Sequence, residues 1–386
     1  MDKVRYGIIG IGNMGSGHCK SLDGGLVKDA CLTAVCDIKP ERLQWAKENL
    51  SPSVALFDND EEFFEKAQID VVIIAVPHYQ HPPLAIEAFR RGLNVITEKP
   101  AGVYTKQVRE MNEAAAKSGK LFGIMYNQRT NPVYQKVKDL VESGELGEIK
   151  RVVWIITSWY RTQSYYNSSS WRATWAGEGG GVLLNQDPHQ LDLWQWMCGM
   201  PKRVRAFMQY GKGRDIEVEN DVTAYVEYPN GATGLFVTST HETPGTNRLE
   251  ISADKGKLVV EDDKITFWRN RVGEQEFNAN YQQGFGEPEC WKCEIPTPGE
   301  NKQHVGILEN YTAALLHKTP LLAPGEEGIK GLSISNAMHL SAWTDSWVEL
   351  DSLDEELFYQ LLKKRADESK FHKVSSEVTL DVTGTH

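Results

Sequence analysis

The chain has 386 residues, of which 40% are hydrophobic and 25% charged, and its formal net charge at pH 7 is -11. This length exceeds one ordinary compact core, so two domains of a water-soluble globular protein are expected. The acidic balance and the lack of a basic cluster argue against a nucleic acid or an anionic membrane surface as partner, because phosphate binding requires concentrated Lys and Arg. The expected partner is a small molecule.

The chain enters a strand-like run at once, in MDKVRYGIIG, without a charged leader, a long apolar segment or a small-residue cleavage site. Apolar runs elsewhere are too short to span a bilayer. We therefore expect a cytoplasmic protein that has no membrane partner.

The cysteines and clustered histidines do not indicate a metal site. Of six cysteines only Cys290 and Cys293 form a close pair, and a structural zinc site requires two more ligands at matching spacing. His78 and His81, in HYQH, have no acidic or cysteine residue beside them. Reduced thiols and no metal are expected.

Residues 1–130 alternate between strand-like and helix-like segments. Strands joined by helical crossovers lie parallel, with helices on both faces of a doubly wound sheet. The run VVIIAV is apolar throughout, which is typical of a strand buried on both sides. The strand-like runs are 4–10, 32–37, 54–57, 70–77, 94–100 and 121–127, and the helix-like segments between them include 40–50, 60–67, 82–92 and 105–119.

The first turn carries the strongest local motif. Gly10, Gly12 and Gly15 form GIGNMG between a strand and a helix, where glycines allow a tight turn and a close approach of the backbone to a pyrophosphate. Asp37 closes the second strand 22 residues after Gly15, where its carboxylate is placed to bind the adenosine ribose 2′-hydroxyl. The same carboxylate repels a 2′-phosphate, so the motif favours NAD over NADP despite nearby Lys39.

The fifth strand-like run ends in Glu98, Lys99 and Pro100. Ligands of open parallel sheets bind beyond the carboxyl ends of the strands, so Lys99 is expected on the cofactor side. A lysine at a strand end is more often a solvated surface charge, so this position needs support from other motifs.

The second part of the chain reads as a different architecture. The runs 150–159, 221–228, 233–240 and 248–253 alternate apolar and polar residues and predict antiparallel strands. This part is therefore expected to differ in architecture from the first, and the chain after about 365 is expected to be a tail, 366–386, that is either loose or packed against the rest.

A helix start is predicted within GGGVLLNQDPHQLD, residues 179–192. Asp187 is expected as N-cap, Pro188 at the first helical position and Gln190 at the capping-box position. His189 then lies in the first turn, where the helix dipole favours the neutral imidazole that a general base requires. Asp192, one turn further, either orients that imidazole or is an ordinary helix residue.

Six segments occur here in the order found in the glucose-fructose oxidoreductase, inositol dehydrogenase and MocA (GFO/IDH/MocA) family. The resemblance covers residues 4 to about 345, and the sequences of these motifs are most similar to those of sugar and glycoside dehydrogenases of that family. The segments are GIGNMG, VPHYQH, EKP, MYNQRTNPVYQKVKDLVESGELGEI, WRATWAGEGGG and the HxxD stretch.

The resemblance implies a nucleotide-binding Rossmann domain at 1–130, followed by an α+β domain at 131–365 with a large, open, mainly antiparallel sheet. In the family that sheet covers the nicotinamide and often forms the oligomer interface, so a homo-oligomer, a dimer or a tetramer, is expected. Motif matches place the following residues at the NAD cofactor: Gly10, Ile11, Gly12, Asn13, Met14, Gly15, Asp37, Val76, Pro77, His81, Glu98, Lys99, Asn127, Trp171 and Arg172.

By resemblance, the catalytic group is the Lys of EKP together with an Asp and a His spaced four apart. Lys99 and His189 match, but Asn185 stands at the Asp position. An amide does not exchange protons as a carboxylate does, so Asn185 is expected to orient a substrate hydroxyl. Asp187 and Arg161 are the other expected substrate-binding residues.

The expected reaction is oxidation of a secondary hydroxyl of a sugar or glycoside by hydride transfer to NAD, with C3 of a glucoside as the specific hypothesis. Aromatic residues crowd positions 158–175, which suits either stacking on a sugar or a packed loop. Two alternatives remain open: a redox-neutral enzyme that cleaves glycosides with tightly bound NAD, and a non-catalytic dinucleotide-binding sensor kept plausible by Asn185.

Overall fold

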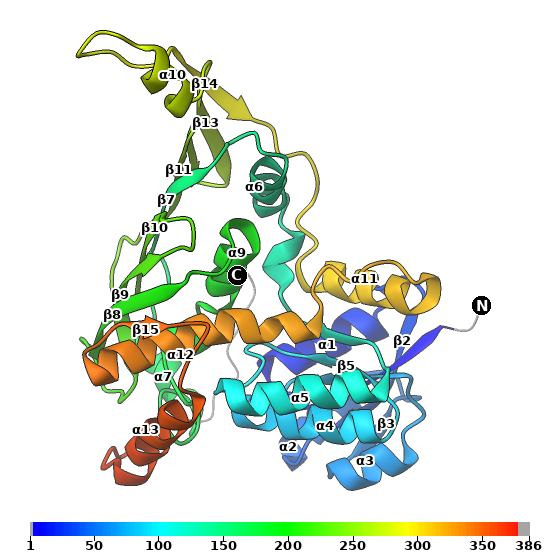
Figure 1. Ribbon diagram of the computed structural model, residues 1–386. Helices are drawn as coiled ribbons and strands as arrows, with labels where there is room; N and C mark the ends of the chain where they lie inside the picture. Colours follow the sequence, from blue (N-terminus) through cyan, green and yellow to red (C-terminus); the bar gives the residue numbers. More distant parts are fainter. Residues whose placement is uncertain (1–2, 377–386) are drawn as a thin grey trace.

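The computed structural model describes residues 3–376, which fold around two sheets that share one buried core (Figure 1). The first sheet has six strands in the order β3-β2-β1-β4-β5-β6, and every neighbouring pair is parallel. This confirms the predicted doubly wound sheet. Its strands are β1 (Val4–Ile9), β2 (Ala30–Cys36), β3 (Ala55–Phe57), β4 (Val71–Ile74), β5 (Asn94–Thr97) and β6 (Phe122–Ile124), and its helices are α1 (Asn13–Asp23), α2 (Pro40–Asn49), α3 (Asp60–Lys66), η1 (His78–Gln80), α4 (His81–Arg90), α5 (Thr105–Ser118) and η2 (Asn127–Thr130).

Local sequence accounts for these elements well. β4 reads VVII and all four of its side chains are buried, as expected for a strand covered on both faces. α3 begins where the Asn59 side chain accepts a hydrogen bond from the Glu62 N–H. α5 ends at Gly119, whose φ of 65° is the left-handed conformation that glycine adopts at low cost.

The second sheet has nine strands in the order β14-β13-β12-β11-β7-β10-β9-β8-β15. All its neighbouring pairs are antiparallel except one. A large, mainly antiparallel sheet is therefore confirmed. Its strands are β7 (Ile149–Ile156), β8 (Arg203–Tyr210), β9 (Glu219–Glu227), β10 (Thr233–Ser239), β11 (Asn247–Ala253), β12 (Gly256–Glu261), β13 (Lys264–Asn270), β14 (Cys290–Ile295) and β15 (Val348–Glu349), and helices in this part are α6 (Pro132–Glu142), α7 (Gln163–Asn167), α8 (Val182–Asn185), α9 (Pro188–Cys198) and α10 (Glu274–Asn280).

The exception corrects one expectation from the sequence. β7 and β10 were both expected in antiparallel pairs. Each has one antiparallel neighbour, β11 for β7 and β9 for β10, but the two strands pair with each other in parallel, with Leu235 opposite Val153. The chain leaves β7 for a long excursion through α7, α8 and α9, and it re-enters the sheet at β8. A long crossover of this kind permits parallel neighbours, whereas a short hairpin enforces antiparallel ones.

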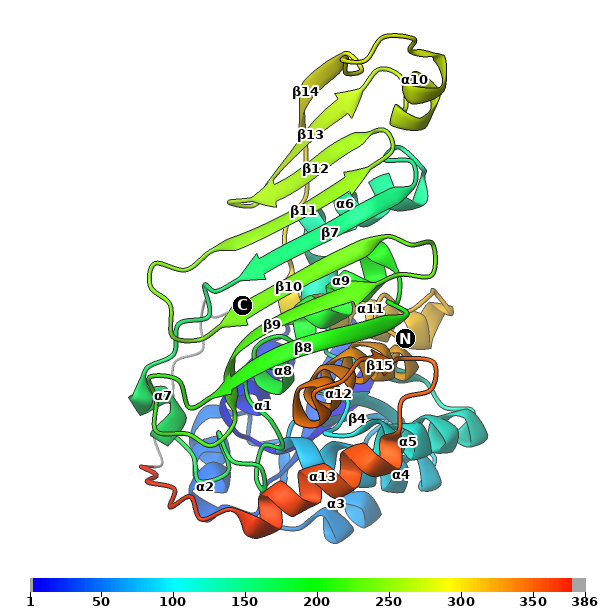
Figure 2. The same cartoon turned by 60° about the vertical axis from the view of Figure 1, so that its left-hand side comes forward.

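Helices α6 and α9, with α12 (Gly328–Thr344), cover one face of the nine-stranded sheet (Figure 1). Trp194 of α9 stacks on Phe236 of β10, with ring centroids 5.1 Å apart. Figure 2 shows the other face of the sheet, which these three helices leave open. Phe207 of β8 is 60% exposed.

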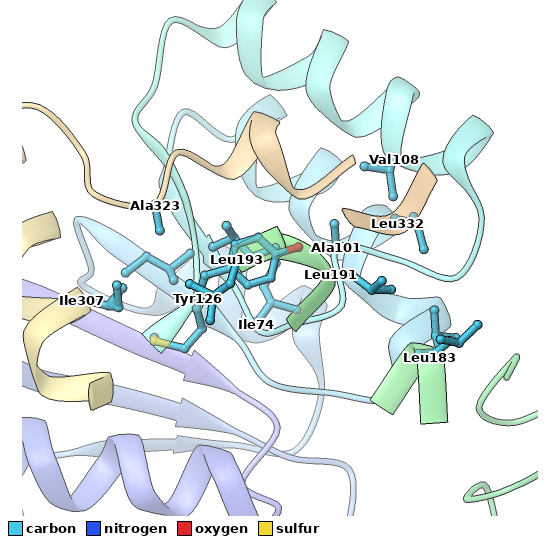
Figure 3. Packing of buried hydrophobic residues seen from close by; sticks show 14 of the residues in the cluster. Ile74, Ala101, Val108, Tyr126, Leu183, Leu191, Leu193, Ile307, Ala323 and Leu332 are labelled. Atoms are coloured by element: carbon cyan, nitrogen blue, oxygen red, sulfur yellow. The ribbon is translucent and has the colours of Figure 1, made fainter. Parts of the chain in front are cut away.

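The two sheets meet in apolar contacts drawn from distant parts of the chain. Figure 3 labels members of the buried cluster that come from both parts of the chain: Ile74 and Tyr126 from the first sheet region, Leu191 from α9, Ile307 from α11 (Gln303–His317) and Leu332 from α12. All five belong to one buried cluster. The site described below therefore lies on a continuous packed core.

The segment after the second sheet returns to the first. On α11, Tyr311 donates its hydroxyl to the Leu121 carbonyl at 2.7 Å, and the Thr312 hydroxyl lies 2.8 Å from the Tyr6 hydroxyl. η3 (Gly325–Glu327) follows beside β6. Residues 303–327, assigned from the sequence to the second domain, thus pack on the first sheet.

α13 (Glu355–Glu368) runs past the expected tail boundary at 365. The chain after it packs on the α7 region, where Lys373 Nζ donates to the Tyr166 carbonyl at 2.6 Å and Ser376 N–H donates to the Asn167 carbonyl at 2.8 Å. The remainder of the predicted tail, 377–386, lies outside the described residues. Over residues 3–376, no helix is both long and apolar enough to cross a membrane.

Candidate active site

The glycine turn after β1 combines close packing with an open position. A Cβ on Gly10, whose φ is 91°, would lie 2.6 Å from the Ala75 carbonyl oxygen, and one on Gly15 would lie 1.9 Å from the Gly10 oxygen. A Cβ on Gly12 would meet nothing within 4 Å. Gly12 is the N-cap of α1 and supplies no capping side chain, so the first backbone N–H groups of the helix suit a pyrophosphate.

Asp37, at the end of β2, holds this turn in place. One carboxylate oxygen accepts the Ile11 N–H at 2.7 Å, and the other accepts the Lys39 N–H at 3.0 Å. Each carboxylate oxygen has a second lone pair, so the side chain can still accept a ribose hydroxyl. The Oδ1 atom of Asn13, in the same turn, is buried without a hydrogen-bond partner among residues 3–376, as expected for a group that faces a ligand. These residues fit a dinucleotide.

The turn after β5 contains a buried acidic residue next to Lys99. Glu98 Oε1 lies 2.6 Å from His18 Nε2, and Glu98 Oε2 accepts the Lys99 N–H at 3.1 Å. Burial alone would raise the pKa of Glu98, but the hydrogen bond and charge of His18, with the charges of His304 and Lys99, outweigh burial and hold the pKa far below its usual range. Glu98 is therefore an anion throughout the physiological pH range.

Lys99 meets the segment that contains His189. Its Nζ donates to the Asn185 backbone carbonyl at 2.7 Å, which joins two residues 86 positions apart. Burial lowers the pKa of Lys99 to about 8, with Glu98 opposing this shift and Arg172 and Arg161 adding to it. The lysine thus remains an ammonium at neutral pH but loses its proton in mild alkali.

Glu219, at the start of β9, anchors the glycine segment. Both of its carboxylate oxygens accept the Gly181 N–H at 2.8 Å, one of them also accepts the Leu183 N–H at 3.1 Å, and His339 Nε2 lies 3.1 Å away. A Cβ on Gly181 would lie 1.9 Å from the Glu219 carbonyl oxygen. Only glycine permits this approach, and the approach sets the position of α8 and α9.

His189 lies in the first turn of α9, as expected, and only 4% of it is exposed. The predicted capping interactions around it are absent in residues 3–376. Asp187 is the N-cap but its side chain accepts no N–H, and Gln190 Oε1 has no partner. The reason is that α8 runs almost directly into α9: the N–H groups of Gln186 and Asp187 both bind the Val182 carbonyl. The N-cap ψ of 3° is not the extended conformation that capping requires.

The Asp187 carboxyl is instead fully buried in the protein interior. Burial raises its pKa to about 8, with Thr238 and Trp159 beside it, although neither forms a hydrogen bond of normal geometry with it. The Asp187 carboxyl is therefore mostly protonated and neutral at neutral pH.

Asp192 does not face His189. Its carboxylate forms a two-pronged ion pair with Arg129, with Nε to Oδ2 at 2.8 Å and Nη2 to Oδ1 at 2.6 Å, and Gln195 donates to it at 3.1 Å. Both partners are 1% exposed, and Arg129 also contacts Glu327. This pair fastens the end of the first domain to α9.

Two arginines lie among the aromatic residues of the 158–175 segment. The Arg161 guanidinium lies 5.5 Å from the Trp159 ring and 5.1 Å from the Tyr165 ring. Arg172 lies 4.5 Å from the Tyr165 ring and 4.9 Å from the Trp171 ring, and it donates to the Tyr165 hydroxyl at 2.6 Å. Trp175, in contrast, is 5% exposed and belongs to the core, so the segment is partly packed and partly available.

The other expected cofactor residues border the same region. His81 ties the turns after β4 and β5 together, because its ring nitrogens each lie 2.7 Å from a backbone oxygen, those of Pro100 and Val76. Asn127 is buried in η2 and donates to Gln303. Within the described chain, no group of three or more His, Cys, Asp or Glu is arranged to hold a metal, and all six cysteines are free.

Sequence reasoning missed the carboxylate that contacts Asn185. Glu178 is 1% exposed, and one oxygen accepts a hydrogen bond from Asn185 Nδ2. The signal was a glutamate in the otherwise apolar and glycine-rich run AGEGGGVLL, since a charge in a buried run is kept only when it is paired. Glu219 and Arg129 carried no such local signal.

A glycine turn at a helix N-terminus, a carboxylate directly after the second strand and a lysine bonded to the segment that bears His189 are features of a nicotinamide-dependent dehydrogenase. The oxidoreductase family model described as an NAD-binding Rossmann fold matches residues 4–126, and the GFO/IDH/MocA C-terminal domain model matches residues 134–259. The chain belongs to the GFO/IDH/MocA family. It is an NAD-dependent oxidoreductase of the sugar dehydrogenase kind, which confirms the expected family, fold class, enzyme class and cofactor.

Relatives in the family share about a quarter of their residues with this chain. The D-glucoside 3-dehydrogenase of Escherichia coli K12 is 26% identical over 90% of this chain and 97% of its own. The myo-inositol 2-dehydrogenase of Thermotoga maritima is 25% identical over 68% of this chain and 77% of its own. The WlbA dehydrogenase of Bordetella pertussis, solved with NADH and UDP-GlcNAcA, superposes with a TM-score of 0.76 at 25% identity over 90% of this chain and 98% of its own.

Proposed function

We propose that this enzyme oxidises a secondary hydroxyl of a sugar or glycoside, at C3 of a glucoside, to give a 3-keto sugar. The hydrogen bond from Lys99 Nζ to the Asn185 carbonyl carries the proposal, because it joins the lysine of the first domain to the segment of His189. The similarity to a D-glucoside 3-dehydrogenase along 90% of the chain supports the choice of substrate.

His189 acts as the general base for the substrate hydroxyl. Its ring is buried and faces the Tyr126 ring edge-on at 6.4 Å, which restrains its orientation. Lys99, as an ammonium, binds the same oxygen and stabilises the negative charge that develops there as the proton leaves. The glycine turn and Asp37 would hold NAD, which would supply the acceptor for the hydride of the carbinol carbon.

Asn185 binds a neighbouring hydroxyl, and Arg161 with its aromatic neighbours forms the wall on which the sugar ring stacks. Asp187 acts as a neutral hydrogen-bonding group near neutral pH, since burial raises its pKa to about 8. Orientation of the sugar thus depends on polar groups that carry no net negative charge.

The test is a turnover assay with NAD and a panel of methyl glucosides, free sugars and inositols, followed at 340 nm and by product mass. A glucoside oxidised to a product lighter by two hydrogens, with one NADH per turnover, supports the proposal. Continuous aglycone release with substoichiometric NADH would instead identify the redox-neutral enzyme. Oxidation of inositols alone would contradict the choice of a glucoside.

Lys99→Met and His189→Phe each test one catalytic role. Both are expected to lower kcat at least about 100-fold, since each removes a group that acts in the transition state. NADH binding, measured by its fluorescence, is expected to change little. Rates close to those of the unmodified enzyme would refute the roles assigned to these residues.

We also propose that two copies pack through the open face of the nine-stranded sheet, where Phe207 is 60% exposed and Trp347 is 41% exposed. Analytical ultracentrifugation of the protein and of Phe207→Glu tests this, and a monomer at micromolar concentration contradicts it. The cytoplasmic location expected from the sequence stays a prediction.

A further inference from the structure

The Glu178 carboxylate collects donors from three sides. Its Oε2 accepts the Ala173 N–H at 2.5 Å, its Oε1 accepts from Asn185 Nδ2, and Arg172 Nη1 lies 3.7 Å from Oε1. Only 1% of Glu178 is exposed. A buried carboxylate costs several kcal/mol unless it is paired in this way.

This contact determines which end of the Asn185 amide is available. Burial raises the pKa of Glu178, and Arg172, the Ala173 N–H and Asn185 Nδ2 oppose this shift by stabilising the anion. In its ionised form the carboxylate only accepts hydrogen bonds, so it faces the donor Nδ2, and Oδ1 points away from it. No residue among those described binds Oδ1. The backbone carbonyl of Asn185 meanwhile accepts Lys99 Nζ at 2.7 Å, which fixes the main chain that bears the amide.

We propose that Glu178 is a positioning residue that holds Asn185 as a hydrogen-bond acceptor for one hydroxyl of the substrate. An aspartate at position 185 would offer an acceptor in either orientation, whereas an asparagine offers one only when its amide is held the right way round. Glu178 and Asn185 together therefore supply the acceptor that the family motif provides with one carboxylate. This inference rests on the proposed function.

An exchange of donor and acceptor within the pair gives a sharp test. In Glu178→Gln the side chain can present either its oxygen or its amide nitrogen, so the Asn185 amide is no longer held. In the double variant Glu178→Gln/Asn185→Asp, the glutamine nitrogen donates to the new aspartate, whose other oxygen is again an acceptor. The pair is restored with its polarity reversed.

The probes are methyl β-glucoside and its monodeoxy analogues. We expect Glu178→Gln to lower kcat/KM for the parent glucoside about 10- to 100-fold, the range for a substrate hydroxyl that loses its buried partner. For the analogue that lacks the hydroxyl bound by Asn185, the same variant is expected to change kcat/KM less than about twofold. The double variant is expected to recover most of the preference for the hydroxyl over the deoxy substrate.

Glu217→Gln is the matched control. Glu217 accepts the Trp175 N–H at 2.9 Å and the Ser369 hydroxyl, so it holds the same loop as Glu178 but does not contact Asn185. Its substitution is expected to lower thermal stability without changing the ratio of kcat/KM between the parent and deoxy glucosides. A purely structural role for Glu178 predicts the same behaviour for Glu178→Gln.

The pH profile is a second readout. Glu178 raises the pKa of Lys99 electrostatically, alongside Glu98 and against burial, Arg172 and Arg161. The alkaline limb of kcat/KM is therefore expected at lower pH in Glu178→Gln, and it is expected to return in the double variant. The proposal would be overturned if folded Glu178→Gln kept both the pH of the alkaline limb and the ratio of kcat/KM between the parent and deoxy glucosides.

The remaining outcomes are also decisive. If Glu178→Gln yields no folded protein, the double variant alone carries the test: a preserved preference for the hydroxyl supports the proposal and a lost preference overturns it. If the unmodified enzyme oxidises no glucoside but oxidises another polyol, the proposed substrate fails, and the Glu178 test is repeated with that polyol and its deoxy analogues. NADH affinity is expected to stay the same in every variant.

Discussion

Asp187→Asn is expected to make the protein more stable at neutral pH, even though it removes an acidic group from the active-site segment. Asp187 is fully buried, and burial raises its pKa from 3.8 to about 8. Between these two values the folded protein retains a proton that the unfolded chain has released. The unfolded state then binds fewer protons than the folded state, so the free energy of unfolding falls as pH rises through this window.

The magnitude follows from the size of the shift. Each pH unit between 3.8 and about 8 costs the folded protein about 1.4 kcal/mol, which amounts to about 4 kcal/mol at pH 7. Asparagine carries no such cost, but its amide, buried without good partners, costs about 1–3 kcal/mol. The net gain from Asp187→Asn is therefore about 1–3 kcal/mol at pH 7, and it disappears near pH 5.

The assay is urea denaturation of the two proteins at pH 5, 6 and 7 with the m values compared. The difference in unfolding free energy is expected to grow by about 1.4 kcal/mol per pH unit. Asp351→Asn, in an exposed turn, is the control and is expected to show no such growth. A difference that is independent of pH, or that shrinks as pH rises, would refute a neutral Asp187.

Three further predictions concern other parts of the molecule. Asp192→Ala leaves the 1%-exposed Arg129 guanidinium without its main partner, and it is expected to lower the free energy of unfolding, measured by urea denaturation, by about 3–5 kcal/mol. The control Asp139→Ala, on the surface of α6, is expected to lower it by less than about 1 kcal/mol. If the Lys99 ammonium is the active form, kcat falls as pH rises through about 8, and a rate that is flat from pH 7 to 9.5 contradicts this. Asp37→Ser is expected to raise KM for NAD about 10-fold and to lower the discrimination against NADP. If the ratio of kcat/KM for the two cofactors is unchanged, Asp37 serves only to hold the glycine turn.

The first domain was predictable because its signals are local. The period of apolar residues, the caps and the glycine turn each act within a few residues of the chain, so the strands and helices of 4–127 fall where their patterns indicate. Gly10 and Gly15 are required by contacts within the same strand-turn-helix unit.

The second sheet was only partly predictable, since the pairing of its strands depends on long-range contacts. The parallel pair of β7 and β10 follows from the path of the intervening chain, which neither strand encodes. β14, CWKCEI, pairs on one side only and leaves most of its side chains exposed, so its sequence lacks the alternation that identifies a strand.

The sequence by itself determined that a lysine ends a buried strand, that a histidine begins a helix and that an asparagine stands where the family has an aspartate. Only the tertiary structure decided that Lys99 donates to the Asn185 carbonyl, 86 residues away in the sequence, and that Arg129 forms an ion pair with Asp192, 63 residues away. Local pattern sets which side chains an element presents, but the burial of apolar faces between the two sheets sets which of them meet. That burial also decided that Asp187 is neutral and Glu178 is paired, because the pKa and the partners of a group depend on everything packed around it.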